Sequence, residues 1–163
     1  MSMLTPALVT NDPMLLPPRD EPYVLKDVLE KNVHGCRDAI VLDLGDCCLR
    51  IGVEINYDTL LFRFQSRPFK PTKRWVSLRN SEPWKTCTGK ECGWTWLAVN
   101  QQGYLDTALI SFDGIEPSIM LQAIASSIEV FTIAPAKAMA VAKAARNGRP
   151  KAHHEPRLVK KRL

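Results

Sequence analysis

The segment from Gly93 to Asp106 most constrains the fold, because it predicts two strands joined by a tight turn. Aromatic and β-branched residues, which favour strands, lie on both sides of the turn. Gly103 stands where the turn is expected to need a positive φ. The first strand is apolar on both faces, which is typical of a strand covered on both sides. We therefore expect a β-rich core, with Trp94 and Trp96 directed into it.

Further strands are predicted by runs in which apolar and polar residues alternate with a period of two. The clearest run is Cys47 to Ile55, which follows a Gly45-Asp46 hairpin turn. The other predicted strands are 39–44, 60–64, 73–79, 93–100, 104–112, 118–124 and 127–133. Over residues 117–127 a helix competes with a strand, and strand is the preferred interpretation for the first half.

Two helices are predicted outside these strands. Between Tyr23 and Val33 the apolar residues recur at i, i+1, i+4 and i+5, which predicts a short amphipathic helix ending near Gly35. Residues 136–146 contain six alanines and predict a second helix, ended by Gly148 and Pro150. The predicted fold class is α+β. It is mainly an antiparallel sheet of about 6–8 strands, arranged as a sandwich or partly open barrel, with one N-terminal and one C-terminal helix.

The chain is predicted to contain one domain with extended ends. Residues 1–22 hold five prolines and are expected to form a flexible arm. Residues 23–135 form the globular domain, 136–148 the alanine-rich helix and 149–163 a disordered basic tail. Residues 1–135 carry 13 Lys and Arg against 16 Asp and Glu, so the body is mildly acidic.

One pattern resembles a known family. Trp96-x3-Asn100-Gln101-Gln102-Gly103-Tyr104-x-Asp106 is followed about twenty residues later by Ala125-Ser126-Ser127-Ile128. This combination, mainly within residues 93–134, is similar to a small bacterial β-rich domain family of unknown function. The resemblance implies a compact β-rich bacterial domain and implies no chemistry.

An enzyme is not expected. Two of the three histidines, His153 and His154, lie in the predicted tail, where no catalytic partner could be held in place. Weak zinc-ligand candidates are His34, Cys36, Cys87 and Cys92. Their spacing permits a structural zinc site but is not diagnostic of one, and buried thiols are the preferred interpretation. No metal and no cofactor are predicted.

A non-enzymatic protein-binding module is the predicted function, and bacterial immunity and adaptor proteins are analogues of this kind. The binding candidates are Asn100, Gln101, Gln102, Tyr104, Asp106 and the loop residue Trp84. The mildly acidic body suits a basic protein partner, whose identity and the oligomeric state stay open. An odd cysteine count and the lack of a signal-peptide pattern predict a cytoplasmic location without membrane contact.

Nucleic-acid association is the alternative. The tail has nine basic residues and one acidic residue over 136–163, a composition that suits a phosphate backbone or an acidic protein. Asn147-Gly148-Arg149-Pro150-Lys151 resembles the core of an AT-hook, with Asn147 where an arginine is usual. The candidate contact residues are Arg146, Arg149, Lys151, Arg157, Lys160, Lys161 and Arg162.

Overall fold

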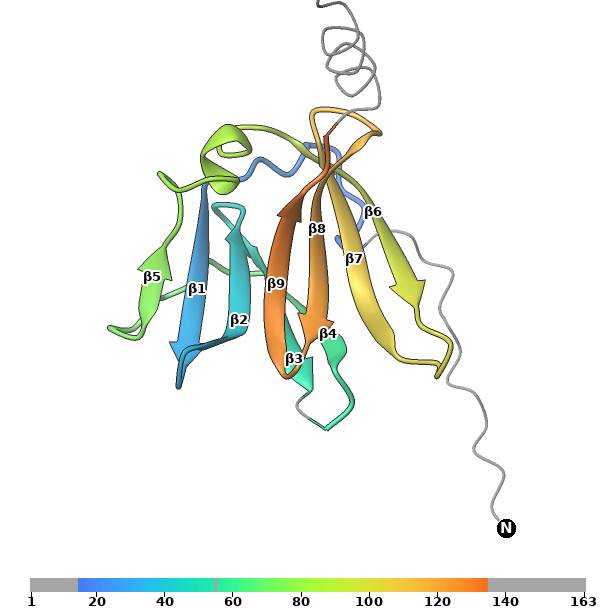
Figure 1. Cartoon of the computed structure of the whole chain (residues 1–163). Helices are drawn as coiled ribbons and strands as arrows, with labels where there is room; N and C mark the ends of the chain where they lie inside the picture. Colours follow the sequence, from blue (N-terminus) through green and yellow to red (C-terminus); the bar gives the residue numbers. More distant parts are fainter. Residues whose placement is uncertain (1–14, 55, 135–163) are drawn as a thin grey trace, which may run out of the picture. The chain divides into compact units, whose positions relative to one another are not determined.

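The computed structural model describes residues 15–54 and 56–134, which form two antiparallel sheets (Figure 1). The first sheet has the order β4-β3-β2-β1-β5 and the second the order β6-β7-β8-β9. The strands of the first are β1 (Asp27–Val33), β2 (Cys36–Asp43), β3 (Cys48–Glu54), β4 (Thr59–Gln65) and β5 (Trp75–Ser77). Those of the second are β6 (Cys92–Val99), β7 (Leu105–Phe112), β8 (Pro117–Ile124) and β9 (Ser127–Thr132).

The predicted strands are confirmed, and the choice between strand and helix at 117–127 is resolved in favour of strand. β8 and β9 form a hairpin whose turn residues, Ala125 and Ser126, have φ of 48° and 64°. The loop predicted at 80–92 contains a single short 3-10 turn, η1 (Trp84–Thr86). With nine strands among the described residues, the sheet content exceeds the predicted range of 6–8.

The α+β class is wrong, because residues 15–54 and 56–134 contain no α-helix. The helix predicted over 23–33 is strand β1. Within β1, the adjacent residues Val28 and Leu29 are both buried, but on opposite faces of the strand. Val28 lies in the main core, and Leu29 lies in a small cluster on the far side of the sheet. The predicted C-terminal helix at 136–148 and the basic tail at 149–163 lie outside the described residues.

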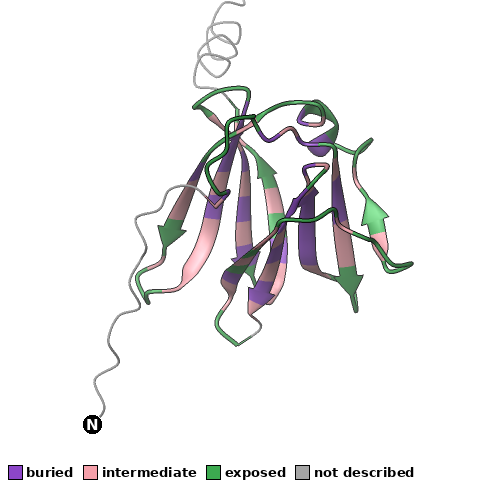
Figure 2. Cartoon of the chain, turned by 180° about the vertical axis from the view of Figure 1, so that it is seen from behind, coloured by how far each residue is buried: buried purple, intermediate pink, exposed green. Residues whose placement is uncertain are grey.

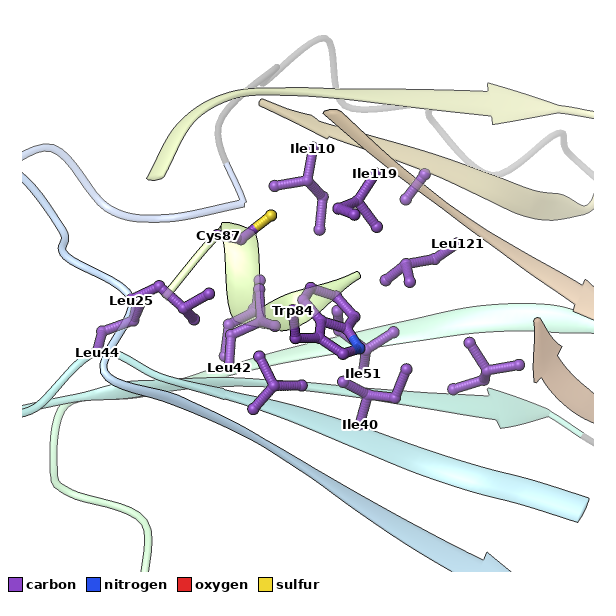
Figure 3. Packing of buried hydrophobic residues seen from close by; sticks show 14 of the residues in the cluster. Leu25, Ile40, Leu42, Leu44, Ile51, Trp84, Cys87, Ile110, Ile119 and Leu121 are labelled. Carbon is purple, nitrogen blue, oxygen red and sulfur yellow. The ribbon is translucent and has the colours of Figure 1, made fainter. Parts of the chain in front are cut away.

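The main core lies between the two sheets. Trp84, on η1, is 1 % exposed and is among the largest fully buried side chains. Figure 3 shows its indole among Ile40, Leu42 and Ile51 of the first sheet, with Ile110, Ile119 and Leu121 of the second sheet opposite. Burying one such large apolar side chain stabilises a fold by roughly 1.5–3 kcal/mol. Buried and exposed bands alternate along the strands (Figure 2), as expected when one face of each sheet meets the core.

A second, smaller cluster lies on the outer face of the first sheet. β4 and β5 are at opposite edges of that sheet, so residues 66–74, here named the crossover, must pass over it. Phe69 of the crossover and Trp75 of β5 pack on Leu29, Val41 and Cys48. Part of this outer face is therefore covered by the chain itself, which explains why β1 and β2 are apolar on both sides.

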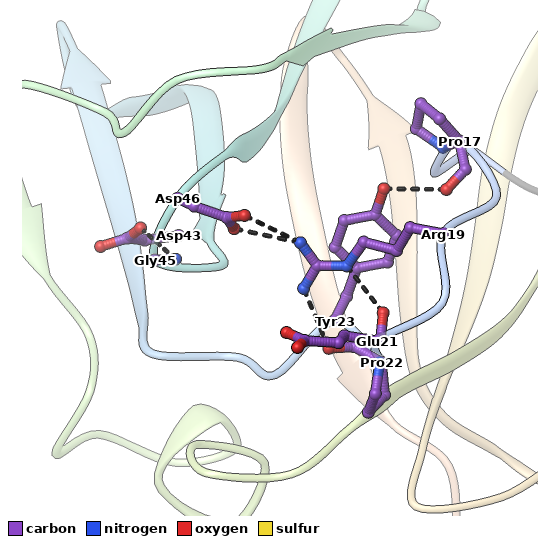
Figure 4. A network of polar contacts seen from close by, with 8 residues as sticks. All are labelled: Pro17, Arg19, Glu21, Pro22, Tyr23, Asp43, Gly45 and Asp46. Atoms are coloured by element: carbon purple, nitrogen blue, oxygen red, sulfur yellow. Dashed lines mark hydrogen bonds and ion pairs between the residues drawn. The ribbon is translucent and has the colours of Figure 1, made fainter.

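Residues 15–22 were predicted to be part of a flexible arm, but they pack against the sandwich. Leu16 is 8 % exposed. The guanidinium of Arg19 donates to both carboxylate oxygens of Asp46 at 3.2 and 3.0 Å, and it lies 3.9 Å from the ring centroid of Tyr23 (Figure 4). The Tyr23 hydroxyl donates to the carbonyl of Pro17 at 2.8 Å. These contacts fix the chain where it enters β1.

Candidate functional site

The Asn100–Tyr104 turn is held by the side chain of its first residue. Asn100 Oδ1 accepts hydrogen bonds from the backbone N–H groups of Gln102, at 2.9 Å, and Tyr104, at 3.1 Å. Gly103 has a φ of 87°, as the turn was predicted to require. The Asn100 side chain is therefore used to build the turn, whereas Gln101 and Gln102 are exposed.

Two other predicted binding residues have local structural partners. The ring of Tyr104 packs against that of Tyr57, with centroids 5.5 Å apart, and so joins the β6–β7 turn to the β3–β4 turn. Asp106 Oδ1 accepts from the hydroxyl of Thr107 at 3.0 Å. The turns at this end of the sandwich support one another, since Asp58 also accepts from the backbone of Ser126 at 2.6 Å.

The tryptophans are placed differently from the prediction. Trp84 belongs to the core and is not available to a partner. On β6 the residues that face the core are Thr95, 6 % exposed, and Leu97, whereas Trp94 is 49 % exposed and Trp96 is half-buried. The expectation that Trp94 and Trp96 point into the core is therefore wrong.

Trp96 instead belongs to a row of large apolar side chains that crosses the outer face of the second sheet. The register pairs Trp96 with Leu109, Leu109 with Met120, and Met120 with Phe131. None of the four is buried, and Phe131 is 40 % exposed. We call these four residues, with Trp94 beside them, the outer apolar row. Alternation in the sequence shows which residues of one strand share a face. Only the register shows that these four residues are aligned across four strands.

Two segments of the fold carry charge of one sign only, whereas residues 27–54, which contain β1, β2 and β3, carry both signs. Residues 59–81, which contain β4, the crossover and β5, carry six Lys and Arg and no Asp or Glu. Residues 91–134, which contain the whole second sheet, carry five Asp and Glu and no Lys or Arg. Each run is visible in the sequence, but only the strand order shows that the basic run lies in the first sheet and the acidic run in the second.

The outer face of the first sheet is hollowed beside this basic run. A shallow concavity of about 320 Å³ is lined by residues that include Asp38, Arg50, Gly52 and Arg63. A neighbouring one of about 480 Å³ lies against Arg67, Phe69 and Lys70 of the crossover. Gly52 has no side chain to fill the first concavity, and Leu61 beside it is 50 % exposed.

The candidate zinc ligands are not brought together. His34 lies in the turn after β1, and Cys36 is the first residue of β2. Cys87 and Cys92 lie near the start of β1, where Gly89 N–H donates to the carbonyl of Leu25. Within the described residues no group of three or more His, Cys, Asp and Glu could hold a metal ion. Burial, with Cys87 and Cys47 nearby, raises the pKa of the Cys92 thiol to about 12, which opposes the thiolate form that metals need.

The seven basic tail residues proposed for nucleic-acid contact, from Arg146 to Arg162, lie outside the described residues. In the part of the chain that the structure describes, no helix has the length and apolar character needed to cross a membrane.

Comparison with known proteins gives one match. No curated protein and no solved structure matches the chain. A family model matches residues 22–137, which span β1 to β9 and both outer faces described above. This confirms the resemblance to a β-rich family without an assigned function, and the chain belongs to the family of unknown function DUF6334.

Proposed function

We propose that this chain is a non-enzymatic protein-binding module of the bacterial immunity or adaptor kind, and that it binds its partner through the outer apolar row. The observation that carries the proposal is the register Trp96–Leu109–Met120–Phe131, one large apolar side chain on each of four adjacent strands. Adjacent strands lie about 4.8 Å apart, so the row extends over roughly 14 Å.

The composition of the row supports a protein partner. Aromatic residues and methionine are enriched in protein interfaces, and tryptophan is enriched among the residues that dominate binding energy. Trp94 and Phe131, at 49 % and 40 % exposed, leave large apolar surfaces in water. Contiguous apolar surface of this kind on a small domain indicates an interaction site more often than isolated exposed residues do.

Charge defines the chemistry of that partner. Residues 91–134 contain five carboxylates and no basic residue. Asp113 pairs with Lys90, whereas Glu129 lies on the same face as Phe131, two residues along β9. A partner with an apolar centre and a Lys- or Arg-rich rim therefore complements this face. A cytoplasmic location is part of the proposal, and it is supported by the five cysteines, all of them free.

The test compares two matched double variants of the full chain. Trp94→Ser with Phe131→Ser removes two exposed apolar side chains from the row. Leu61→Ser with Val76→Ser removes two from the first sheet, where they are 50 % and 56 % exposed. Proteins retained by each tagged variant in cells that express the chain are compared by quantitative mass spectrometry. The binding of the purified candidate partner is then measured by calorimetry.

We expect one basic partner to bind the parent chain and the Leu61/Val76 variant equally. We expect it to bind the Trp94/Phe131 variant at least tenfold more weakly. Equal binding by both variants contradicts the proposal. A parent chain that is dimeric in sedimentation, and becomes monomeric only in the Trp94/Phe131 variant, also contradicts it, since the row would then be a contact between two copies.

A further inference from the structure

We propose that the outer face of the first sheet is a second binding site, one that holds the phosphate backbone of single-stranded nucleic acid. The site consists of Arg50 and Arg63 on neighbouring strands together with Arg67, Lys70, Lys73 and Arg74 of the crossover. It lies on a different sheet from the outer apolar row and does not depend on the function proposed for that row.

The central observation is a pair of like charges. Arg50 on β3 and Arg63 on β4 are direct register partners, and both side chains lie on the outer face. Like charges directly opposite each other destabilise a sheet. Within the described residues neither arginine forms an ion pair with a carboxylate. The carboxylate of Asp38, which lines the same concavity, is paired with Lys31 at 2.7 Å. The two guanidinium groups are thus left to bind an anion that comes from outside the domain.

The basic residues form a track and not a single spot. The four basic residues of the crossover are exposed, and the crossover spans the sheet from the β4 edge to the β5 edge. Four strand spacings separate those edges, about 19 Å. One strand of B-DNA carries a phosphate about every 3.4 Å along the helix axis, so a strand stacked in that way places about six phosphates along this distance. A polymer with repeated charges fits such a track better than one small anion does.

Two features favour nucleic acid over an acidic protein. Arginine makes paired, planar hydrogen bonds to phosphate, and it stacks on flat rings. Aromatic rings also lie along the track: Phe69 and Trp75 are half-buried, 4.9 Å apart between centroids, and the Arg50 guanidinium is 5.7 Å from the Trp75 centroid. Basic grooves lined with aromatic side chains are the usual surface for unpaired bases and their backbone.

The experiment uses the full chain and a fluorescein-labelled 20-nucleotide oligo-dT, with binding followed by fluorescence anisotropy from 50 to 200 mM NaCl. The face variant is Arg63→Gln, Arg67→Gln and Lys70→Gln. The matched control removes the same charge from the tail, with Arg146→Gln, Arg149→Gln and Lys151→Gln. A second face variant, Lys73→Gln with Arg74→Gln, guards against a folding defect in the first. A labelled 20-residue poly-Glu peptide tests the acidic-protein alternative.

Six phosphate contacts give a slope of about −4 in log K against log salt, or roughly 300-fold weaker binding across this fourfold salt range. With three contacts removed, the face variant should show a slope of about −2. Its affinity for oligo-dT should then fall by only about 20-fold between the lowest and the highest salt concentration. The tail variant should change the slope by less than one. The proposal is overturned if only the tail variant loses affinity for oligo-dT, or if both triple variants lose it equally. It is also overturned if poly-Glu binds within twofold of oligo-dT, or if the parent chain does not bind oligo-dT at 50 mM salt.

Discussion

Arg37 on β2 and Glu30 on β1 form an ion pair that also joins the two sheets. Arg37 Nε donates to Glu30 Oε2 at 2.7 Å, while its Nη1 donates to the carbonyl of Ile128 on β9 at 2.9 Å. The Glu30 and Arg37 side chains are only 12 % and 28 % exposed. The pair is therefore shielded from water, and it closes the sandwich where β2 meets β9.

Replacing Arg37 with Leu should destabilise the fold. It removes two charge-assisted hydrogen bonds and leaves the Glu30 carboxylate with only the amide of Asn32 as a side-chain donor, for an expected loss of about 1.5–3 kcal/mol in urea unfolding. Lys90→Leu is the matched control. Its ion pair with Asp113 is exposed and 3.8 Å long, so its loss should cost less than about 0.5 kcal/mol. Equal effects of the two substitutions would show that the link between the sheets is unimportant.

Trp84→Ala should be among the most destabilising single substitutions in the domain. The indole fills the space between the sheets at 1 % exposure, and removing such a side chain costs about 3–5 kcal/mol. Trp94→Ala, at a position 49 % exposed, should change the free energy of unfolding by no more than about 0.5 kcal/mol. Chemical denaturation of both variants checks this contrast, and a Trp84 variant as stable as the parent chain would refute the placement of the indole in the core.

Gly93 should tolerate no larger residue. A Cβ there would lie 2.6 Å from the Ser111 hydroxyl oxygen and closer still to the carbonyl oxygen of Gly114. That hydroxyl already forms two hydrogen bonds, since it accepts from Trp94 N–H at 2.6 Å and donates to the Gly114 carbonyl at 2.7 Å. Gly93→Ala is expected to cost about 1–3 kcal/mol.

The control for Gly93 is Gly52→Ala, on a strand of the other sheet. A Cβ at Gly52 would have its nearest contact at 3.9 Å, so this variant should match the parent chain or gain up to about 1 kcal/mol. Thermal unfolding of both variants separates the effect of crowding from the general effect of adding a methyl group to a strand. A neutral Gly93→Ala would mean that the bulge between Cys92 and Thr95 is looser than the register implies.

Sequence alternation located the strands well, since each is a local pattern, but it failed where a strand is buried on both faces. Val28 and Leu29 are adjacent and both apolar, which suits a helix face. In the fold, Leu29 is covered by Phe69 and Trp75, from residues about forty positions later in the chain. A local pattern carries no information about that cover. The helix prediction for 23–33 is therefore wrong because the cover of the second face comes from residues distant in the sequence.

The same limit applies to the candidate site. Asn100 and Gly103 were correctly recognised as turn residues, because turn chemistry is local. The direction of Trp94 and Trp96 was wrong because β6 is apolar on both sides, so composition alone does not choose the core face. The pairing of Arg50 with Arg63 depends on strand register, which the sequence does not specify. The basic run of 59–81 was readable from the start, but its position over one sheet was not.

The Arg50–Arg63 pair predicts a gain in stability when one charge is removed. Arg63 is exposed and forms no ion pair within the described residues, so Arg63→Gln relieves repulsion without breaking an ion pair. We expect an increase of about 0.2–1 kcal/mol in the free energy of unfolding, largest at low salt. Arg79→Gln, also exposed and basic, is the control and should have no effect. A loss of stability in Arg63→Gln would mean that the guanidinium group stabilises the fold. It would then no longer be left to bind an external anion.

Alkaline pH should destabilise the domain through Cys92. Burial raises the pKa of this thiol from its ordinary value of 9.0 to about 12. Between these values the unfolded chain loses the thiol proton while the folded chain keeps it, so the stabilisation is complete below pH 9 and lost as pH rises toward 12. The expected slope is about 1 kcal/mol per pH unit above pH 9. Cys92→Ala should remove this part of the slope in urea unfolding with reductant present, whereas Cys36→Ala, which removes an exposed thiol, should retain it. If the slopes of both variants equal that of the parent chain, then Cys92 is accessible to water and its packing against the main core is loose.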